Sequence, residues 1–413
     1  MPTDLPASLD PVPTVGVHIR RRDPAYLRAS AALVLAGFAT FSMIYCVQPL
    51  LPVLAKDFHL GAAQSSLALS LTTGLLAISI LLGGAVSEAV GRKPLMAASL
   101  CLAAVFNLLA SAAPAWPLLL LARALEGVAL GGAPAVAMTW LSEEIEPGDL
   151  GFAMGLYVAG TALGGMAGRV VTGAAADLGG WRMALAAIGG LGLVSAAGFA
   201  LLLPASRNFH PRRDLTAGHH LRAWGGHLRH PGLPWVFATG FLVMGGFVSI
   251  YNYAGFRLTA PPYGLSQTQA GLIFLVYLFG MAGSSLAGAL ADRLGRAPVL
   301  IGGLAVFAAG LALTLLQPLA VVIAGVALVT IGFFVAHAVA SGWVGRLASR
   351  SKGHAASLYL LAYYAGSSLL GSAGGWFWTA AGLAGVAAYV AVILAIALLA
   401  ALKLAGAARR AHA

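Results

Sequence analysis

Charged residues are scarce in this sequence. Asp, Glu, Lys and Arg together make up 9% of its 413 residues, whereas soluble globular proteins carry roughly 25%. The sequence also has only two cysteines, Cys46 and Cys101, and both lie in apolar stretches. The shortage of charge excludes an ordinary soluble enzyme, and two isolated cysteines provide neither a disulfide framework nor a metal site.

Long apolar runs take the place of charge. Residues of the AVILMFWYC set make up 60% of the chain, and 53 residues are glycine, which is typical of closely packed membrane helices. Runs long enough to cross a bilayer predict twelve spans, at residues 29–55, 65–87, 95–113, 117–141, 151–172, 183–203, 234–254, 269–290, 298–316, 319–341, 355–374 and 381–403. The predicted fold is therefore an all-α membrane protein with twelve transmembrane helices.

The basic residues indicate how the spans are oriented. If both termini lie inside, most Lys and Arg residues fall in inside segments, and only Lys56, Arg182 and Arg257 fall in outside loops. Short cytoplasmic loops of membrane proteins are enriched in Lys and Arg. We therefore expect both termini to be cytoplasmic, and the same bias accounts for the net charge of +11 without a nucleic-acid partner.

Composition divides the chain into five predicted parts. Residues 1–28 are expected to form a flexible cytoplasmic tail, because they are rich in proline and lack the apolar run of a signal peptide. A six-helix bundle at 29–203, a basic linker at 204–233, a second six-helix bundle at 234–403 and a cytoplasmic tail at 404–413 follow. The linker is rich in histidine, with His210, His219, His220, His227 and His230. No thiol or carboxylate accompanies them at ligand spacing, so we expect no metal site.

The two halves of the chain repeat one loop motif. Gly84-Ala-Val-Ser-Glu88-Ala-Val-Gly91-Arg92-Lys93 follows the second span, and Gly288-Ala-Leu-Ala-Asp292-Arg293-Leu-Gly295-Arg296 follows the eighth. Two similar halves with both termini inside are related by an axis along the membrane normal, and a central cavity lies between them. The duplication therefore predicts two pseudo-symmetric bundles that alternate access to this cavity. Ion pairs of the motif that form in only one state would act as a gate.

This repeated motif resembles motif A of the major facilitator superfamily. The resemblance covers about residues 29–403; the second copy matches fully, and the first differs by Glu88 in place of aspartate and Ala89 in place of arginine. The resemblance implies the major facilitator fold and a secondary transporter of a bacterial inner membrane, most like the drug or metabolite–proton antiporters. Such a protein would act as a monomer, need no cofactor, and have protons and a small organic substrate as its partners.

Span four holds two of the few ionisable residues that lie within the membrane, where they are costly. Arg123 and Glu126 are spaced i,i+3, which places both on one helix face. Counted from Pro117, Glu126 lies about 13 Å deep in an apolar core about 30 Å thick. One interpretation makes Glu126 a proton acceptor, and the other makes the pair a permanent link that holds span four. The segment is similar to motif B of the superfamily, which implies a role for Arg123 in proton coupling.

Span five carries Gly160, Gly164 and Gly168, followed by Arg169. This resembles motif C of the antiporter branch, with Gly165 in place of proline and Arg169 in place of the last glycine. The resemblance favours export, although close helix packing alone explains such a stripe. Arg169 is expected near the outer end of the span, where its side chain can snorkel to the surface. Arg169 and His337, near the inner end of span ten, are secondary candidates for a direct role.

Polar and aromatic residues of spans one, seven and eight are candidates for substrate contact, since interrupted segments in corresponding halves point to a central site. They are Tyr45, Gln48, Tyr251, Asn252, Tyr253 and Tyr277. Tyr359, Tyr363 and Tyr364 would add aromatic walls or, with Trp376 and Trp378, form an interfacial belt. One buried carboxylate among many aromatic residues predicts a cavity for amphiphilic or weakly cationic molecules.

These features together predict a proton-coupled antiporter that exports small drug-like or metabolite molecules. Uptake of a metabolite by proton symport or facilitated diffusion is the alternative. The sequence contains no H-E-x-x-H, G-x-S-x-G or G-x-x-x-x-G-K-[ST] pattern, so neither catalysis nor ATP-driven pumping is indicated. A receptor would leave the repeated motif unexplained.

Overall fold

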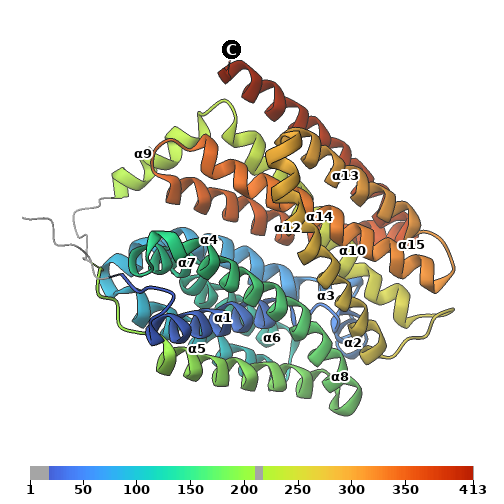
Figure 1. The fold of residues 1–413 in the computed structure, drawn as a ribbon. Helices are drawn as coiled ribbons and strands as arrows, with labels where there is room; N and C mark the ends of the chain where they lie inside the picture. The colour runs from blue at the N-terminus through green and yellow to red at the C-terminus, as the bar shows by residue number, and fades with distance from the viewer. Residues whose placement is uncertain (1–17, 210–216, 413) are drawn as a thin grey trace, which may run out of the picture.

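The computed structural model describes residues 18–209 and 217–412, and these residues form helices joined by short loops (Figure 1). The first half contains α1 (Pro24–Tyr45), α2 (Leu51–Asp57), α3 (Ala62–Ser65), α4 (Leu67–Val90), α5 (Arg92–Ser111), α6 (Trp116–Leu130), α7 (Gly132–Glu144) and α8 (Pro147–Leu202). After the linker helix α9 (Ala217–Leu228), the second half contains α10 (Leu233–Thr259), α11 (Gln267–Leu272), the 3-10 turn η1 (Ile273–Val276), α12 (Tyr277–Leu294), α13 (Arg296–Leu313), α14 (Leu319–Leu347) and α15 (Lys352–His412).

Ten helical segments within the described ranges are long and apolar enough to cross a membrane. Two of them are double: α8 is broken at Gly179 and Gly180, and α15 at Ala381 and Gly382, where the backbone leaves helical geometry. Each of these two helices therefore folds back on itself and crosses twice. The predicted twelve crossings and the all-helical membrane fold are confirmed.

Prolines set several helix starts and one early helix end. Pro24, Pro117, Pro147 and Pro234 each occupy the first turn of a helix, where a missing N–H costs nothing. The predicted first span, 29–55, is wrong at both ends, because α1 already begins at Pro24 and ends at Tyr45. The residue before a proline disfavours helical geometry, and a turn containing Pro49 separates α1 from the short α2.

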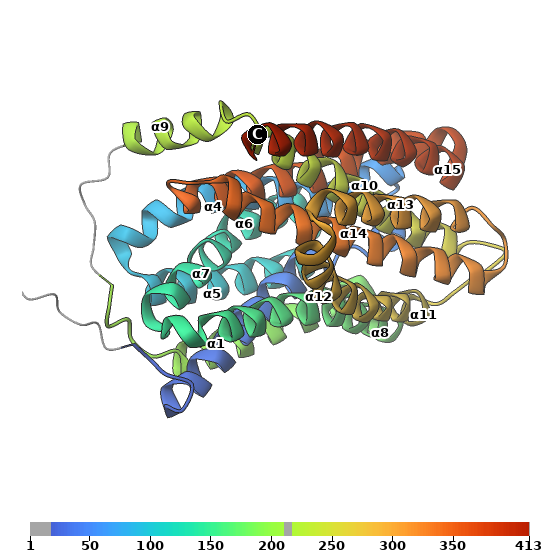
Figure 2. The ribbon, with the colours of Figure 1, turned by 45° about the horizontal axis from the view of Figure 1, so that its top comes forward.

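The helices gather into two bundles, which we call the first bundle (α1–α8) and the second bundle (α10–α15) (Figures 1 and 2). In both bundles, glycine lets the opening helix pack closely against a long helix. A Cβ added to Gly164 of α8 would clash with the carbonyl oxygen of Phe38 in α1, and one added to Gly366 of α15 would clash with that of Phe241 in α10. The same close approach recurs at corresponding places, as a duplicated unit requires.

The repeated loop motif has the same backbone geometry in both copies. Gly91 joins α4 to α5 with φ 97° and ψ 156°, and Gly295 joins α12 to α13 with φ 88° and ψ 158°. A side chain rarely tolerates this positive φ, so glycine is the residue that permits the short turn at both places. We call the end of the molecule that carries these two turns the motif end, and the opposite end the far end.

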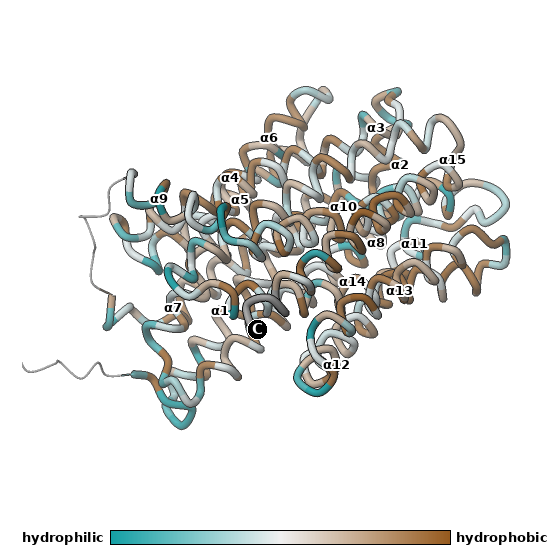
Figure 3. Tube along the Cα trace, turned by 90° about the horizontal axis from the view of Figure 1, so that it is seen from above, coloured by the Kyte–Doolittle hydropathy of each residue, from teal (hydrophilic) through white to brown (hydrophobic). Residues whose placement is uncertain are grey.

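Hydrophobic residues predominate along the helices, and hydrophilic residues gather toward the helix ends and loops (Figure 3). Leu82, Leu109 and Leu286 are each more than half exposed. Such a continuous apolar exterior would drive aggregation in water, whereas it matches the hydrocarbon of a bilayer, in which helices satisfy their own backbone groups.

The tails and linker differ in part from their predicted outlines. Residues 1–17 of the predicted N-terminal tail and His210 of the linker lie outside the described residues. The linker contains a helix, α9. The Nδ1 atom of His220 in this helix lies 2.9 Å from the Nε2 atom of His354 in α15. In the part of the chain that the structure describes, no group of His, Cys, Asp and Glu has the arrangement of a metal site. At the C-terminal end, α15 continues past the predicted boundary at residue 403 to His412.

Candidate functional site

A cavity of about 600 Å³ lies between the two bundles. Residues of α1 and α8 line it on one side, and residues of α10, α12, α14 and α15 line it on the other. Its lining contains the cationic side chain of Arg169 and the imidazole of His337, but no aspartate or glutamate. The rest of the wall is aromatic, aliphatic or hydroxyl-bearing, as in sites for small organic ligands.

The far end of the cavity is closed by hydrogen bonds between the bundles. The Gln48 side-chain amide donates to the Asn252 Oδ1 at 2.7 Å, and the Ser66 and Ser70 hydroxyls meet the Ser372 hydroxyl. Nearer the surface, Asp177 of α8 accepts hydrogen bonds from the backbone N–H groups of Gln267 and Thr268, at 3.0 and 2.8 Å. These bonds join α8 and the first-bundle spans to α10, α11 and α15.

At the motif end, ion pairs stay within their own bundle. Arg92 lies 2.7 Å from both Glu88 and Glu143 in the first bundle, and Arg346 lies 3.5 Å from Asp292 in the second. Lys93 donates to the Leu203 carbonyl of its own bundle. Between residues 18–203 and 233–405, no hydrogen bond or ion pair joins the bundles at this end, and the cavity lining reaches toward it through Met154 and Ser285.

The predicted Arg123 and Glu126 contact is present. Arg123 Nη1 lies 2.6 Å from Glu126 Oε2, and both side chains are fully buried in the first bundle. Arg123 also donates to the backbone carbonyls of Met43, Ile44 and Ala68, and so ties α6 to α1 and to α4. Within residues 18–209 and 217–412, Glu126 Oε1 has no hydrogen-bond partner, and Glu126 does not line the cavity. The carboxylate therefore lies behind the cavity wall rather than in it.

Arg169 does not snorkel to the surface as predicted. Its side chain is 1% exposed; Nε donates to Gln48 Oε1 and Nη1 to the Gly165 carbonyl, at 2.7 and 2.6 Å. The rings of Tyr45, Phe274 and Tyr277 lie 4.3, 4.8 and 5.0 Å from its guanidinium carbon. The reason is that α8 lies between the bundles at this level, so its inward face meets α1 and the second bundle instead of water.

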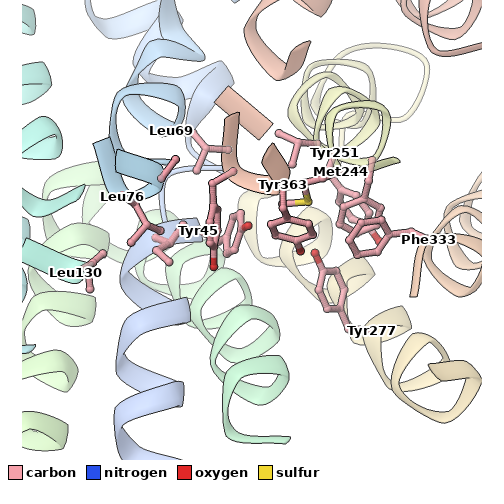
Figure 4. Close-up of a cluster of buried hydrophobic side chains, with 14 of the residues drawn as sticks. Tyr45, Leu69, Leu76, Leu130, Met244, Tyr251, Tyr277, Phe333 and Tyr363 are labelled. Atoms are coloured by element: carbon pink, nitrogen blue, oxygen red, sulfur yellow. The ribbon is translucent and has the colours of Figure 1, made fainter. Parts of the chain in front are cut away.

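The predicted aromatic contacts divide into two groups. Tyr45, Tyr277, Tyr363 and Tyr364 line the cavity, and Figure 4 shows Tyr45, Tyr277 and Tyr363 close together. Tyr251, Asn252 and Tyr253 do not line it: the Tyr251 hydroxyl bonds to Thr330, and the Tyr253 hydroxyl to the Gly371 carbonyl. Consecutive helical residues point about 100° apart, so three in a row cannot all face one cavity.

Span ten (α14) lines the cavity with several side chains besides the predicted His337. His337 lines the cavity and bonds to the Tyr359 hydroxyl at 2.8 Å, and its ring stacks on Phe333. Phe333, His337 and Ser341 all line the cavity, and their spacing of four places them on one helix face. This spacing of four residues is the sequence pattern from which the cavity-facing side of span ten could be predicted. Trp376, in contrast, is 72% exposed, in keeping with a place in an interfacial belt.

The glycine stripe of span five has a packing role. Added Cβ atoms on Gly160, Gly164 and Gly168 would meet the backbone of Val34, Phe38 and Ser42 in α1. The corresponding contact of Gly366 with Phe241 in the second bundle shows that such packing belongs to the repeat itself.

Comparison with known proteins places this architecture in a family. A family model described as Major Facilitator Superfamily matches residues 33–261 and 247–412. The chain belongs to the major facilitator superfamily. It is 49% identical to the inner membrane transport protein YnfM of Escherichia coli, over 92% of this chain and 91% of that protein. It is 42% identical to the uncharacterized MFS-type transporter YybF of Bacillus subtilis, over 92% of this chain and 94% of that protein.

Solved structures of the superfamily share the fold at low sequence identity. A bacterial homologue of the human lysosomal transporter Spinster, in an inward-facing and occupied conformation, has a TM-score of 0.74 at 15% identity and covers 94% of this chain and 97% of its own. A mutant form of the nucleoside transporter NupG has a TM-score of 0.74 at 14% identity over 93% and 99% of the two chains. These structures show the shared fold. The family match and the 49% identity to an inner membrane transport protein show that the chain is a membrane transporter of the major facilitator type.

Proposed function

We propose that this protein is a proton-coupled secondary transporter that exports small organic compounds by alternating access. One observation carries the proposal: the cavity between the bundles is closed at the far end by inter-bundle hydrogen bonds and lacks such bonds at the motif end, among the residues that the structure describes. Rocking of the two bundles would open the far end of the cavity and close the motif end. A cavity that is closed on one side at a time carries solute across without forming an open channel.

The motif end is proposed to face the cytoplasm. Both motif loops carry arginine or lysine, at Arg92, Lys93, Arg293 and Arg296, and short cytoplasmic loops are enriched in these residues. Both termini of the chain then lie in the cytoplasm of a bacterial cell whose inner membrane holds the protein. The conformation of the structure is inward-facing in this orientation.

Glu126 is proposed as the proton site. It is a carboxylate in the membrane interior with one unpartnered oxygen and one cationic partner, Arg123. Protonation would neutralise Glu126 and weaken the charge-assisted hydrogen bond that Arg123 donates to it. Arg123 also donates to the Met43 and Ile44 carbonyls. These two carbonyls flank the end of α1, where Tyr45 forms part of the cavity wall. Proton binding at Glu126 would therefore shift a helix end that touches the substrate.

Export is the proposed direction because span five resembles the antiporter motif. Uptake by symport is the alternative, and one assay separates them. In liposomes that hold the purified protein and a pH-sensitive dye, an exported substrate moves opposite to protons, whereas a symported substrate moves with them.

The decisive variant is Glu126→Gln, which keeps the shape of the side chain but cannot bind and release a proton. We expect it to retain substrate exchange between equal concentrations and to lose substrate-driven proton movement. Full proton coupling in this variant would assign the proton site elsewhere. Flux that is unaffected by collapse of the pH gradient would leave a facilitator rather than a coupled transporter.

A further inference from the structure

We propose that the cavity selects organic anions, and that Arg169 binds their carboxylate group. This inference rests on the proposed transport function and names the substrate class of the same cavity. It replaces the weakly cationic substrate expected from the sequence, because the carboxylate behind that expectation, Glu126, lies outside the cavity and is paired with Arg123.

The charges around the cavity favour an anion. Arg169 is the permanently charged side chain of the lining, and no aspartate or glutamate accompanies it there. Among the described residues, Arg169 forms no ion pair. Its partners are a side-chain amide, a backbone carbonyl and the rings of Tyr45, Phe274 and Tyr277, all of which are uncharged. A buried cation whose partners are all neutral has an unbalanced charge. A carboxylate ligand would balance it, through the paired N–H groups that make guanidinium a carboxylate-binding group.

The position of Arg169 also links binding to the closure of the far end. Gln48 accepts a hydrogen bond from Arg169 Nε and donates one to Asn252 of the second bundle. A carboxylate that takes the place of Gln48 on the guanidinium releases this amide from one of its two partners. The hydrogen bond from Gln48 to Asn252, which helps to close the far end, is then weakened, because Arg169 no longer holds the Gln48 side chain in place. Anion binding would in this way favour opening of the far end.

The remaining wall indicates what the anion carries. The rings of Phe41, Tyr45, Phe247, Tyr277, Phe333 and Tyr363 line the cavity together with methionine side chains from both bundles. Such a wall binds apolar and aromatic groups. The volume of about 600 Å³ lies within the range of small-ligand sites. The substrate class is therefore a small aromatic or otherwise apolar carboxylic acid in its anionic form.

Three naphthalene compounds of similar size separate charge from shape: 1-naphthoate, 1-naphthalenemethanol and 1-naphthylmethylammonium. Their binding to the purified full-length protein in detergent is measured by titration calorimetry at one pH, with no membrane gradient. We expect 1-naphthoate to bind about tenfold tighter than the other two, as for a charge-assisted contact. Equal or tighter binding of the cation, or no measurable binding of 1-naphthoate, would overturn the proposal.

The variant Arg169→Gln tests the residue. We expect its affinity for 1-naphthoate to fall about tenfold while its affinity for 1-naphthalenemethanol stays unchanged, since the apolar wall is intact. Arg182→Gln is the matched control, because Arg182 is half exposed, lies just after the break in α8 and does not line the cavity; it should behave as wild type. Unchanged 1-naphthoate binding in Arg169→Gln would contradict the assignment.

If Arg169→Gln does not fold, two measurements still test the proposal: the binding of the three naphthalene compounds to wild-type protein, and their binding to Arg169→Lys. Lysine retains the charge without the paired N–H groups, so 1-naphthoate should still bind tighter than the neutral alcohol, with an affinity below that of wild type. Loss of all charge preference in Arg169→Lys would contradict the proposal. Because these measurements involve no pH gradient, failure of proton coupling at Glu126 would leave the anion preference intact, and loss of the preference would leave proton coupling untouched.

Discussion

The two bundles share a scaffold but divide the chemistry between them. The charged side chains buried among the described residues all belong to the first bundle: Arg92, Arg123, Glu126, Glu144 and Arg169. The second bundle contributes rings to the cavity instead, from Phe247, Tyr277, Phe333 and Tyr363. The repeat has thus kept the glycine contacts and turns that shape each bundle. The buried charged side chains lie in the first bundle, and most of the rings that line the cavity come from the second.

The two copies of the loop motif show the same contrast. Arg92 is 4% exposed and meets two carboxylates. Asp292 of the second copy pairs instead with Arg346 of α14, and these two side chains are 68% and 67% exposed. The copy that departs from the usual motif, with Glu88 for aspartate, therefore makes the more buried network. Exposed pairs contribute little to stability, and buried ones depend on complete pairing.

The largest expected effect of this contrast is on stability. Arg123→Ala leaves Glu126 buried without its cationic partner, and we expect the protein to lose about 3–5 kcal/mol of stability. Arg346→Ala, which breaks the exposed pair of the second bundle, should cost less than about 1 kcal/mol. Thermal unfolding in detergent measures both. Equal losses in the two variants would contradict the unequal distribution of buried charge.

The shared scaffold predicts equal effects in the two bundles. Gly164→Leu and Gly366→Leu each place a side chain against a helix backbone, and we expect each to cost about 1–3 kcal/mol by overpacking. Gly190→Leu and Gly302→Leu are the matched controls, because no atom lies within 4 Å of an added Cβ at either position. Unfolding temperatures provide the comparison. A severe loss at only one of the two packed glycines would show that the halves do not pack alike.

The aromatic wall of the second bundle predicts an effect that does not depend on ligand charge. Phe333→Leu and Tyr363→Leu should weaken binding of naphthalene carboxylate, alcohol and ammonium alike, by about 0.5–1.5 kcal/mol for each lost ring contact. Phe377→Leu is the control, since Phe377 stacks on Tyr389 away from the cavity lining. Titration calorimetry distinguishes this uniform loss from the charge-selective loss expected at Arg169. If Phe333→Leu or Tyr363→Leu weakened binding of one charge type more than the others, the proposed division of roles between the bundles would be contradicted.

The smallest expected effect concerns the contact of Asp177 with the second bundle. Burial raises the pKa of this carboxyl, but the hydrogen bonds that it accepts from Thr268, Ser266 and Gln267 outweigh burial and hold the pKa below its usual 3.8. Because the pKa of Asp177 is lower in the closed protein, its ionised carboxylate stabilises the contact fully at pH values above 3.8. This stabilisation is lost as the pH falls through the lowered pKa.

Asp177→Ala should therefore favour opening of the far end, by about 0.5 kcal/mol, as for an exposed capping residue. Distances between spin labels across that end measure the shift in population. As the pH falls below 3.8, the open population of the wild-type far end should rise toward that of the variant, and the variant should respond less to pH. A variant that stays as closed as wild type at neutral pH would exclude a locking role for this contact.

Much of the fold could be predicted from the sequence because its signals are local. Apolar runs gave the twelve crossings, and the spacing of Arg123 and Glu126 gave their contact. The direction in which each span faces could not be predicted as well, because helices that are apolar all round carry no amphipathic signal. For this reason the sequence predicts that Tyr251, Asn252 and Tyr253 all face the cavity, whereas none of them lines it. Arg169 was placed by its depth along one helix, whereas its burial depends on the second bundle.

Paired distance measurements test the central claim that the two bundles alternate access to one cavity. Spin labels are placed at exposed, repeat-related positions in a Cys101→Ser protein: Val90 and Leu294 at the motif end, and Ala115 and Gln317 at the far end. On addition of 1-naphthoate and a change of pH, the account predicts that the distance between Val90 and Leu294 shortens while the distance between Ala115 and Gln317 lengthens. Two distances that change together, or that do not change while substrate is transported, would contradict it.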